Sequence, residues 1–286
     1  MPALRRVVRP VVLSARNWIA RTKKLVLGQN IRGLLVTTGQ GLFLVDPEDL
    51  GVGRSLICHG AFGKDEIERI CSLLTAESNV LFVGSHIGSL VVPVSKKVRQ
   101  VVAVEANPDT FQLLTWNLLL NQCANVRPLL VAASDRNGEL EFVASRTNSG
   151  GAKRMPVVKS FDYFADKPSI IKVNAARLDD RIDVDFDLIV MDIEGSEYFA
   201  LKGMQRILSR ARCLIVEFLP HHIKNVSGVR VEEFLALIEP HFSQLTVPSK
   251  SITVGKPQFL STLATMYSRD ECDDGIVFLK ASVTDG

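Results

Sequence analysis

The segment VLFVGSHIG at residues 80–88 carries the strongest structural signal in this 286-residue chain. Its apolar half is typical of a buried strand, and its glycine-bearing half of a tight turn before a helix. A second apolar segment, VVAVE at residues 101–105, ends on Glu105, 17 residues after Gly88. Turn glycines let the backbone approach a ligand closely, and a carboxylate at the end of the next strand can accept hydrogen bonds from two ribose hydroxyls. The pattern predicts a site for a nucleoside-type cofactor.

Apolar and helical segments alternate along the rest of the chain, which predicts an α/β fold. The central strands are continuous apolar runs, as in a mostly parallel sheet with helices on both faces. Strands are expected at residues 126–131, 140–143, 170–173, 187–191, 213–218 and 275–279, and helices at 64–76, from Asn107-Pro108 onward, and at 196–209. Residues 33–45 are predicted to form a hairpin, and residues 46–63 and 144–156 to form loops.

Composition is consistent with one enzyme-sized domain at residues 55–286, preceded by a basic helical and hairpin extension at residues 1–54. The five cysteines are scattered and never form a C-x-x-C pair, which argues against a disulfide framework and a zinc site. They favour a reducing compartment, so we expect a cytoplasmic protein. The longest stretch without charged residues, 78–95, is interrupted by glycines and a proline, so no transmembrane segment is predicted.

The basic residues are concentrated at the N-terminus. Residues 1–45 contain eight basic side chains and no acidic one, leaving 26 basic against 31 acidic residues in the remainder. Three interpretations remain open: a helix packed on the main domain with its basic face in water, peripheral attachment to an anionic membrane, or a transit peptide. We favour the first.

Carboxylates follow or end several predicted strands: Glu105, Asp192, Glu194 and Glu217. Because ligands of parallel sheets bind at the C-terminal strand ends, these groups are expected to line one crevice, where buried carboxylates need partners. Cofactor hydroxyls, a substrate or a cation could serve. Alternatively, Asp192 caps the next helix and Glu217 pairs with a Lys or Arg. No metal site is predicted, because no recognisable ligand spacing is present.

Several motifs, in order, resemble those of the FkbM-like methyltransferases, a family of Rossmann-like S-adenosylmethionine-dependent enzymes. They are the glycine turn at 82–88, E-A-N-P at 105–108, the N-x-x-x-N segment at 117–121, R-L-D-D at 177–180 and D-I-E-G-S-E at 192–197, followed by L-K-G at 201–203. The resemblance covers roughly residues 55–280.

This resemblance implies a seven-stranded sheet, S-adenosylmethionine as cofactor, and methyl transfer, mostly to oxygen, of a sugar, glycolipid or secondary metabolite. An alcohol acceptor also needs a base. The resemblance implies a cofactor site at Gly84, Ser85, His86, Gly88, Glu105, Asn107, Asp135 and Asp192, with Asp192 also facing the acceptor. Asp192, Glu194 and His222 are the catalytic candidates; His221 is a further candidate base, because a histidine titrates in the useful range.

Two positions depart from the family's usual motif: Phe82 replaces an Asp, and His86 replaces an Asn. A phenyl ring cannot accept the hydrogen bonds that the Asp would accept. The alternative hypothesis is therefore a catalytically degenerate binding protein of the same fold. A nicotinamide-dependent oxidoreductase is disfavoured, because the third glycine of its fingerprint is missing.

The expected partner is a small-molecule or glycan-like methyl acceptor. A nucleic acid is not expected, since basic residues gather in the N-terminal arm and aromatic residues make up only 7% of the chain. Acceptor specificity is predicted to lie in residues 46–63, 144–169 and 247–272. The identity of the acceptor and the oligomeric state stay open.

Overall fold

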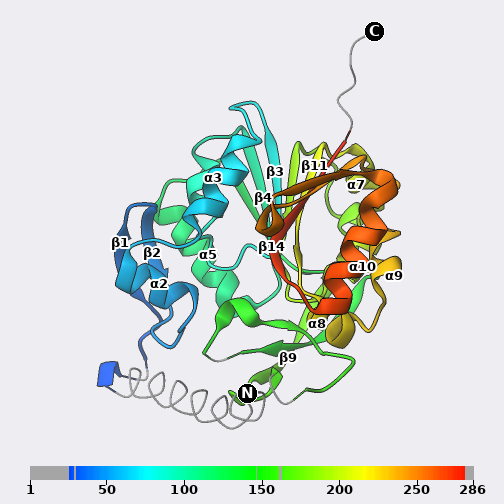
Figure 1. Cartoon of the computed structure of the whole chain (residues 1–286). Coiled ribbons are helices and arrows are strands. Elements are labelled where there is room, and N and C mark those ends of the chain that lie inside the picture. The colour runs from blue at the N-terminus through cyan, green and yellow to red at the C-terminus, as the bar shows by residue number, and fades with distance from the viewer. Residues whose placement is uncertain (1–25, 29, 146, 161–162, 281–286) are drawn as a thin grey trace.

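The computed structural model describes residues 26–28, 30–145, 147–160 and 163–280, and its centre is an eight-stranded sheet (Figure 1). The strand order is β13-β12-β14-β11-β10-β3-β4-β5. The strands are β3 (Asn79–Val83), β4 (Gln100–Glu105), β5 (Val126–Leu130), β10 (Leu188–Met191), β11 (Cys213–Phe218), β12 (Gln244–Val247), β13 (Ile252–Gly255) and β14 (Asp273–Leu279).

The sheet is mixed. Strands β11, β10, β3, β4 and β5 pair in parallel, whereas β14, β12 and β13 pair with their neighbours in antiparallel fashion. The expectation of seven mostly parallel strands is therefore wrong in strand number and at one edge. Strands β12 and β13 escaped prediction because they are four-residue segments, QLTV and ITVG, without a continuous apolar run.

Helices cover both faces of the sheet, as predicted. On one face, Phe82 and its neighbours pack against α2 (Val52–His59), α3 (Lys64–Ser72), α4 (Val91–Ser95) and α5 (Pro108–Leu120). The opposite face packs against α6 (Glu197–Lys202), α7 (Gln205–Arg210), α9 (Val231–Leu235) and α10 (Phe259–Arg269). Figure 1 shows the two helical layers on either side of the strands.

A second, four-stranded sheet, β6-β9-β7-β8, lies at the end of the molecule where α8 (Pro220–His222) follows β11 (Figure 1). Its strands are β6 (Ala132–Ala133), β7 (Gly138–Ala144), β8 (Lys153–Arg154) and β9 (Ser169–Ala176). The strands predicted at 140–143 and 170–173 belong to this sheet, where β7 and β9 pair in antiparallel fashion. It therefore lies at the C-terminal ends of the parallel strands.

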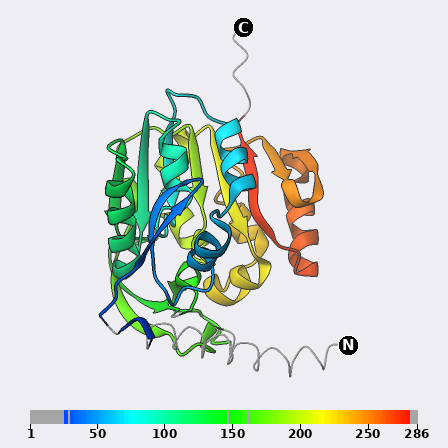
Figure 2. The same cartoon turned by 90° about the vertical axis from the view of Figure 1, so that its left-hand side faces the viewer.

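The predicted hairpin forms from β1 (Leu34–Thr38) and β2 (Gly41–Val45), and it packs in front of α5 (Figure 2). Two asparagines of α5 hold it there. Asn117 accepts from the backbone N–H of Leu44 and donates to its carbonyl, and Asn121 does the same with Leu42. The two asparagine side chains thus form hydrogen bonds with the backbone of β2, as a neighbouring strand would.

Three other expectations need correction. The predicted loop at 46–63 contains α2, because Asp49 accepts the N–H groups of Gly51 and Gly53 at the start of that helix. The helix predicted at 196–209 is two helices, α6 and α7, separated at 203–204. The loop predicted at 144–156 includes a helical turn, Ser149–Gly151, and the short strand β8.

The predicted basic arm falls largely on residues 1–25, outside the described part of the chain. None of the helices in the described ranges combines the length and apolar character that a membrane crossing requires. The division at residues 54 and 55, the cytoplasmic location and the peripheral membrane contact stay predictions.

Candidate functional site

A cavity opens at the C-terminal ends of the parallel strands, between the large sheet and the second sheet. Its lining comes from the ends of β3 and β4, the segments that follow β3, β4 and β10, and the start of α2. Residues 131–133, Leu140, Phe142, 148–150, Ala152 and Arg154 complete it. The fold therefore brings the first part of the glycine turn, Glu105, Asp192 and Glu194 to one space, as the sequence predicted. Gly88 and Glu217, which were expected at the same site, do not line the cavity.

The glycine turn owes its shape to the strand beside it. Gly84 has φ +92°, and a Cβ at this position would overlap the backbone oxygen of Asp192. A Cβ at Gly88, with φ +87°, would lie 2.9 Å from Leu114 Cδ1. Both positions need glycine because of neighbouring protein atoms, and the close contact holds the ends of β3 and β10 together. Ser85 is buried and donates through Oγ to the carbonyl of Val104.

Glu105 is a buried carboxylate fixed by the backbone. Its Oε2 accepts from the N–H of His86 (2.9 Å), and its Oε1 accepts from the N–H of Asn107 (2.8 Å). Burial raises the pKa of Glu105 to about 6, and these backbone hydrogen bonds oppose the rise. The carboxylate is thus charged at neutral pH, and each oxygen retains acceptor capacity toward the cavity.

Two loops meet at the cavity and are joined to each other. The N–H of Leu50 donates to the carbonyl of Thr147 (2.8 Å), and Nε2 of His86 lies 2.7 Å from Oγ of Ser149. His86 has φ +49°, and its ring reaches the 147–151 loop. Desolvation by burial lowers the pKa of His86. The replacement of the family's Asn by His thus supplies a contact with the second loop.

Phe82 forms part of the cavity wall without filling the cavity. Its side chain is 2% exposed and packs on the α2–α5 face of the sheet. Apolar side chains of Val131, Leu140 and Phe142 line the same space. The phenyl ring therefore leaves room for a ligand beside it.

Asp192 and Glu217 form a carboxyl pair. Asp192, just after β10, lines the cavity, and Glu217 lies in the adjacent strand β11. Asp192 is exposed where it lines the cavity, and Glu217 is half-buried. Desolvation, then the charges of nearby carboxylates, raises the pKa of both groups well above their ordinary values. Within the described ranges neither group forms an ion pair with a Lys or Arg, so the alternative that a basic residue pairs with Glu217 finds no support there.

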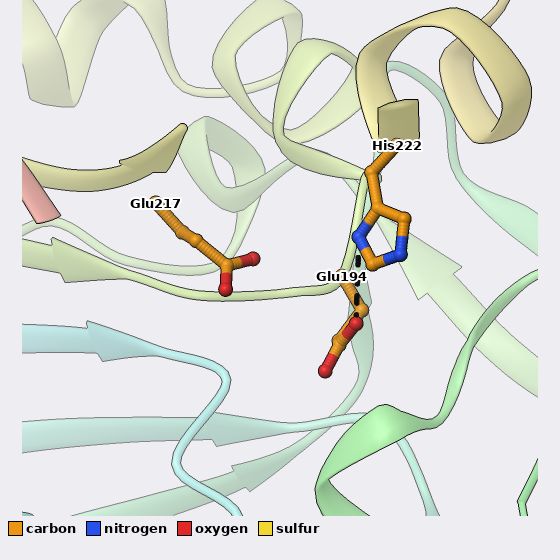
Figure 3. A group of neighbouring side chains, drawn as sticks. All are labelled: Glu194, Glu217 and His222. Atoms are coloured by element: carbon orange, nitrogen blue, oxygen red, sulfur yellow. Dashed lines mark ion pairs between the residues drawn. The ribbon is translucent and has the colours of Figure 1, made fainter. Parts of the chain in front are cut away.

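Glu194 connects the cavity to a lysine and a histidine. Its Oε2 lies 3.0 Å from Nζ of Lys153 and 3.4 Å from Nδ1 of His222 (Figure 3). Lys153 Nζ also lies 3.4 Å from Nε2 of His222. Burial, followed by the charges of Lys153 and His221, lowers the pKa of His222 to about 2, so the imidazole is neutral. His222 is buried and lies in helix α8.

Four of the predicted site residues differ from expectation in their position or their contacts. Asn107 caps α5 by accepting from the N–H of Asp109 (3.1 Å). Asp135 does not line the cavity and lies 3.7 Å from Nζ of Lys202. The side chain of Asp192 does not cap α6, whose N-cap residue is Ser196. His222 stands behind Glu194, outside the cavity lining.

Lys153 is the functional candidate that the sequence did not reveal. It occupies the two-residue strand β8, inside the segment predicted as a loop, and its side chain is 8% exposed. A charged residue in a polar, glycine-bearing segment gives no signal of burial. Only the pairing of β8 with β7 directs it to Glu194.

Comparison with known families identifies residues 83–244, more than half of the chain, with the methyltransferase FkbM domain. The hexuronic acid methyltransferase AglP of Haloferax volcanii is 31% identical over 163 residues, which are 54% of this chain and 62% of that protein. A tRNA(Phe) (4-demethylwyosine(37)-C(7)) aminocarboxypropyltransferase of Methanocaldococcus jannaschii is 30% identical over 107 residues, 36% of this chain and 42% of that protein. The chain thus spans less than two thirds of either relative.

Among solved structures, the methyltransferase FkbM from Methylobacillus flagellatus is 19% identical with a TM-score of 0.41, covering 72% of this chain and 44% of that one. TYW2 of Methanocaldococcus jannaschii in complex with AdoMet is 13% identical with a TM-score of 0.45, and the match covers 88% of each chain. Likenesses this distant carry no argument about the reaction. The family match supports a methyltransferase with S-adenosylmethionine as its cofactor.

Proposed function

This chain belongs to the FkbM methyltransferase family, and from that premise we propose that it methylates a hydroxyl group of a sugar, a glycolipid or a secondary metabolite. One observation carries the proposal. A single cavity is lined by the glycine turn and Glu105 on one side, and by Asp192 and Glu194 on the other. The first set suits a nucleoside, and the second suits a hydroxyl that must lose a proton.

The cofactor-facing part of the cavity fits S-adenosylmethionine. Glu105 is fixed by two backbone hydrogen bonds, so it needs no reorganisation to accept the two ribose hydroxyls. Apolar side chains at 131–133, with Leu140 and Phe142, offer a surface for the base. When bound, the cofactor supplies a methyl group that is already electrophilic, so the chain must mainly align the acceptor and exclude water.

The acceptor-facing part of the cavity would remove the proton of the acceptor hydroxyl. Asp192 and Glu194 line the cavity, so either carboxylate is in place to accept the proton from the acceptor hydroxyl. His222 and Lys153 contact Glu194 from behind and fix its orientation. We therefore assign Asp192 and Glu194 to the acceptor, and His222 to positioning.

A sugar is the favoured acceptor, supported by the similarity to the hexuronic acid methyltransferase. Hydroxylated sugars also suit a site rich in carboxylates, since each hydroxyl can donate to an oxygen. The similarity to a tRNA-modifying enzyme makes tRNA the natural comparison substrate.

The test is methyl transfer from labelled S-adenosylmethionine to separate panels of sugars, uronic acids, glycolipids and unmodified tRNA. We expect incorporation into a sugar-containing panel. A parallel titration with S-adenosylhomocysteine and NADH should show binding of the first only. Incorporation into tRNA alone would contradict the acceptor assignment, and binding of NADH alone would contradict the cofactor.

The degenerate-enzyme alternative finds no support in the relatives, which are enzymes by name. Phe82→Asp is not a clean probe of it, because this position is 2% exposed and a buried carboxylate would destabilise the fold by several kcal/mol. Direct titration of the unmodified chain with S-adenosylhomocysteine is the better measurement. No detectable binding by a folded chain would favour the degenerate enzyme.

A further inference from the structure

We propose that Glu194, Glu217 and His222 form a binding site for one divalent transition-metal ion beside the cavity. The three side chains come from separate elements: the turn after β10, strand β11 and helix α8. One ligand atom from each, two carboxylate oxygens and an imidazole nitrogen, lie within 4.8 Å of one another. Figure 3 shows the three polar ends facing a common space.

The three side chains must move closer together to hold an ion. Transition-metal ions lie about 2.1 Å from nitrogen and oxygen ligands, so two ligand atoms are at most about 4.2 Å apart. That limit holds only for ligands on opposite sides of the ion, whereas neighbouring ligand atoms are about 3.0–3.4 Å apart. Ligand atoms now up to 4.8 Å apart therefore have to move closer by as much as about 1–2 Å. Glu194 and Glu217 are both partly accessible, so their carboxylates can make this movement by rotation.

His222 is the observation that points to a missing partner. Its side chain is 8% exposed, and Nδ1 makes no hydrogen bond within the described part of the chain. This nitrogen faces Oε2 of Glu194 at 3.4 Å, which exceeds an ordinary hydrogen bond. Buried polar atoms are normally paired, and a neutral imidazole is a common metal ligand.

The charges around the site also favour a cation. Asp192, Glu194, Glu197 and Glu217 interact electrostatically, so four carboxyl groups lie close together at this end of the cavity. Among the described residues, Lys153 supplies the ion pair to this group, and it does so from the Nε2 side of His222. Lys153 contacts Nε2, so it does not occupy the Nδ1 side of the ring, which faces Oε2 of Glu194.

The donor set indicates which ions would bind. One imidazole with two carboxylates suits manganese, iron or zinc, whereas magnesium and calcium prefer oxygen ligands alone. The site would also place an ion next to Glu194, and thus at the acceptor side of the cavity. There it would hold the carboxylate of Glu194, which lines the cavity, in one orientation toward the acceptor, a role that rests on the proposed function.

The experiment is calorimetric titration of the chelator-treated full chain with Mn²⁺, and in parallel with Mg²⁺. We expect one Mn²⁺ per chain and at least tenfold weaker binding of Mg²⁺. Glu217→Gln and His222→Ala should each weaken Mn²⁺ binding at least tenfold. The matched controls Glu239→Gln and His59→Ala, at positions away from the cluster, should leave it unchanged.

Several outcomes would overturn the site. One is no saturable Mn²⁺ binding by the wild-type chain, and another is equal binding by both cluster variants when circular dichroism shows that they are folded. A third is binding by Lys153→Met but not by the wild type, which would mean that the lysine already fills the need for a cation.

Binding of S-adenosylhomocysteine, measured on the same samples, separates this proposal from the proposed function. Mn²⁺ binding without S-adenosylhomocysteine binding would leave the metal site standing and remove the methyltransferase assignment. The reverse result would remove the metal site alone.

Discussion

The two sides of the cavity satisfy their charges in different ways. On the glycine-turn side, residues 84–88 and Glu105, the buried carboxylate is held by backbone N–H groups that the fold itself supplies. On the acidic side, formed by Asp192, Glu194, Glu217 and His222, one lysine and a neutral histidine contact Glu194, and the other two carboxyl groups form no ion pair with a described Lys or Arg. The first side is complete without a ligand, whereas the second has negative charge in excess. The difference indicates that the glycine-turn side is preorganised for binding, whereas the charge balance of the acidic side depends on the cation or substrate that binds there.

Glu105→Ala should give the largest effect and would break the glycine-turn side. We expect affinity for S-adenosylhomocysteine to fall more than a hundredfold, since two hydrogen bonds to a charged group contribute roughly 3–6 kcal/mol together. Calorimetry is the measurement, with Glu139→Ala on the exposed face of β7 as control. An unchanged dissociation constant would remove the ribose assignment.

Lys153→Met tests the acidic side through stability. Removing one partner of a largely buried ion pair leaves Glu194 uncompensated, so the free energy of unfolding at pH 7 should fall by about 3 kcal/mol. Adding Glu194→Gln should restore at least half of the loss. Urea denaturation measures both, and Lys172→Met, whose pair with Glu139 is exposed, should change stability by under about 0.5 kcal/mol. If Lys153→Met and Lys172→Met lowered the free energy of unfolding equally, the ion pair of Lys153 would not stabilise the acidic side.

The pH dependence of cofactor binding should report on Glu105. Because burial raises its pKa to about 6, the group becomes neutral below that pH and loses the charge that attracts the ribose hydroxyls. Affinity for S-adenosylhomocysteine should be constant above pH 7 and fall about tenfold by pH 5. A flat profile between pH 5 and 8 would show that binding does not depend on the charge of Glu105.

The same shift has the opposite sign for the stability of the ligand-free chain. A raised carboxyl pKa favours the neutral form in the folded state, so its stabilising contribution is complete below about pH 4.5 and is lost as the pH rises through 6. Ionisation of Glu105 therefore costs the folded chain about 2 kcal/mol at neutral pH. Ligand hydroxyls would offset part of this cost.

Ser149→Ala should have the smallest effect. It removes the contact with His86, worth about 1 kcal/mol, so S-adenosylhomocysteine should dissociate roughly fivefold faster. Stopped-flow displacement is the measurement, with Ser268→Ala on the exposed side of α10 as control. An unchanged rate would mean that the loop at 147–151 does not restrain the ligand.

The glycine-turn side could be predicted because its parts are close in sequence. Strand, turn, helix and terminal Glu105 follow within residues 80–105, and each has a periodicity or composition signal. Glu105, Asp192 and Glu194 were expected in one crevice on this reasoning and are found there.

The acidic side could be predicted only in part, because its members lie far apart in the chain. Lys153 and His222 are 69 residues apart and meet through tertiary contacts alone. The second sheet, which carries Lys153, also has no separate signal, since β7 and β9 read as ordinary strands. Helix α2 was missed because the glycines around it suggested a loop, although Val52 and Leu56 are buried.

The attachment of the β1–β2 hairpin has a consequence for cutting the chain. Asn117 joins the hairpin to the glycine turn, because its amide also donates to the carbonyl of Ile87. Phe43 and Val45 complete the packing over Phe82. We therefore expect a fragment that starts after residue 54 to be markedly less stable, because it would expose apolar surface that the hairpin covers and the two α5 amides would lose their backbone partners in β2.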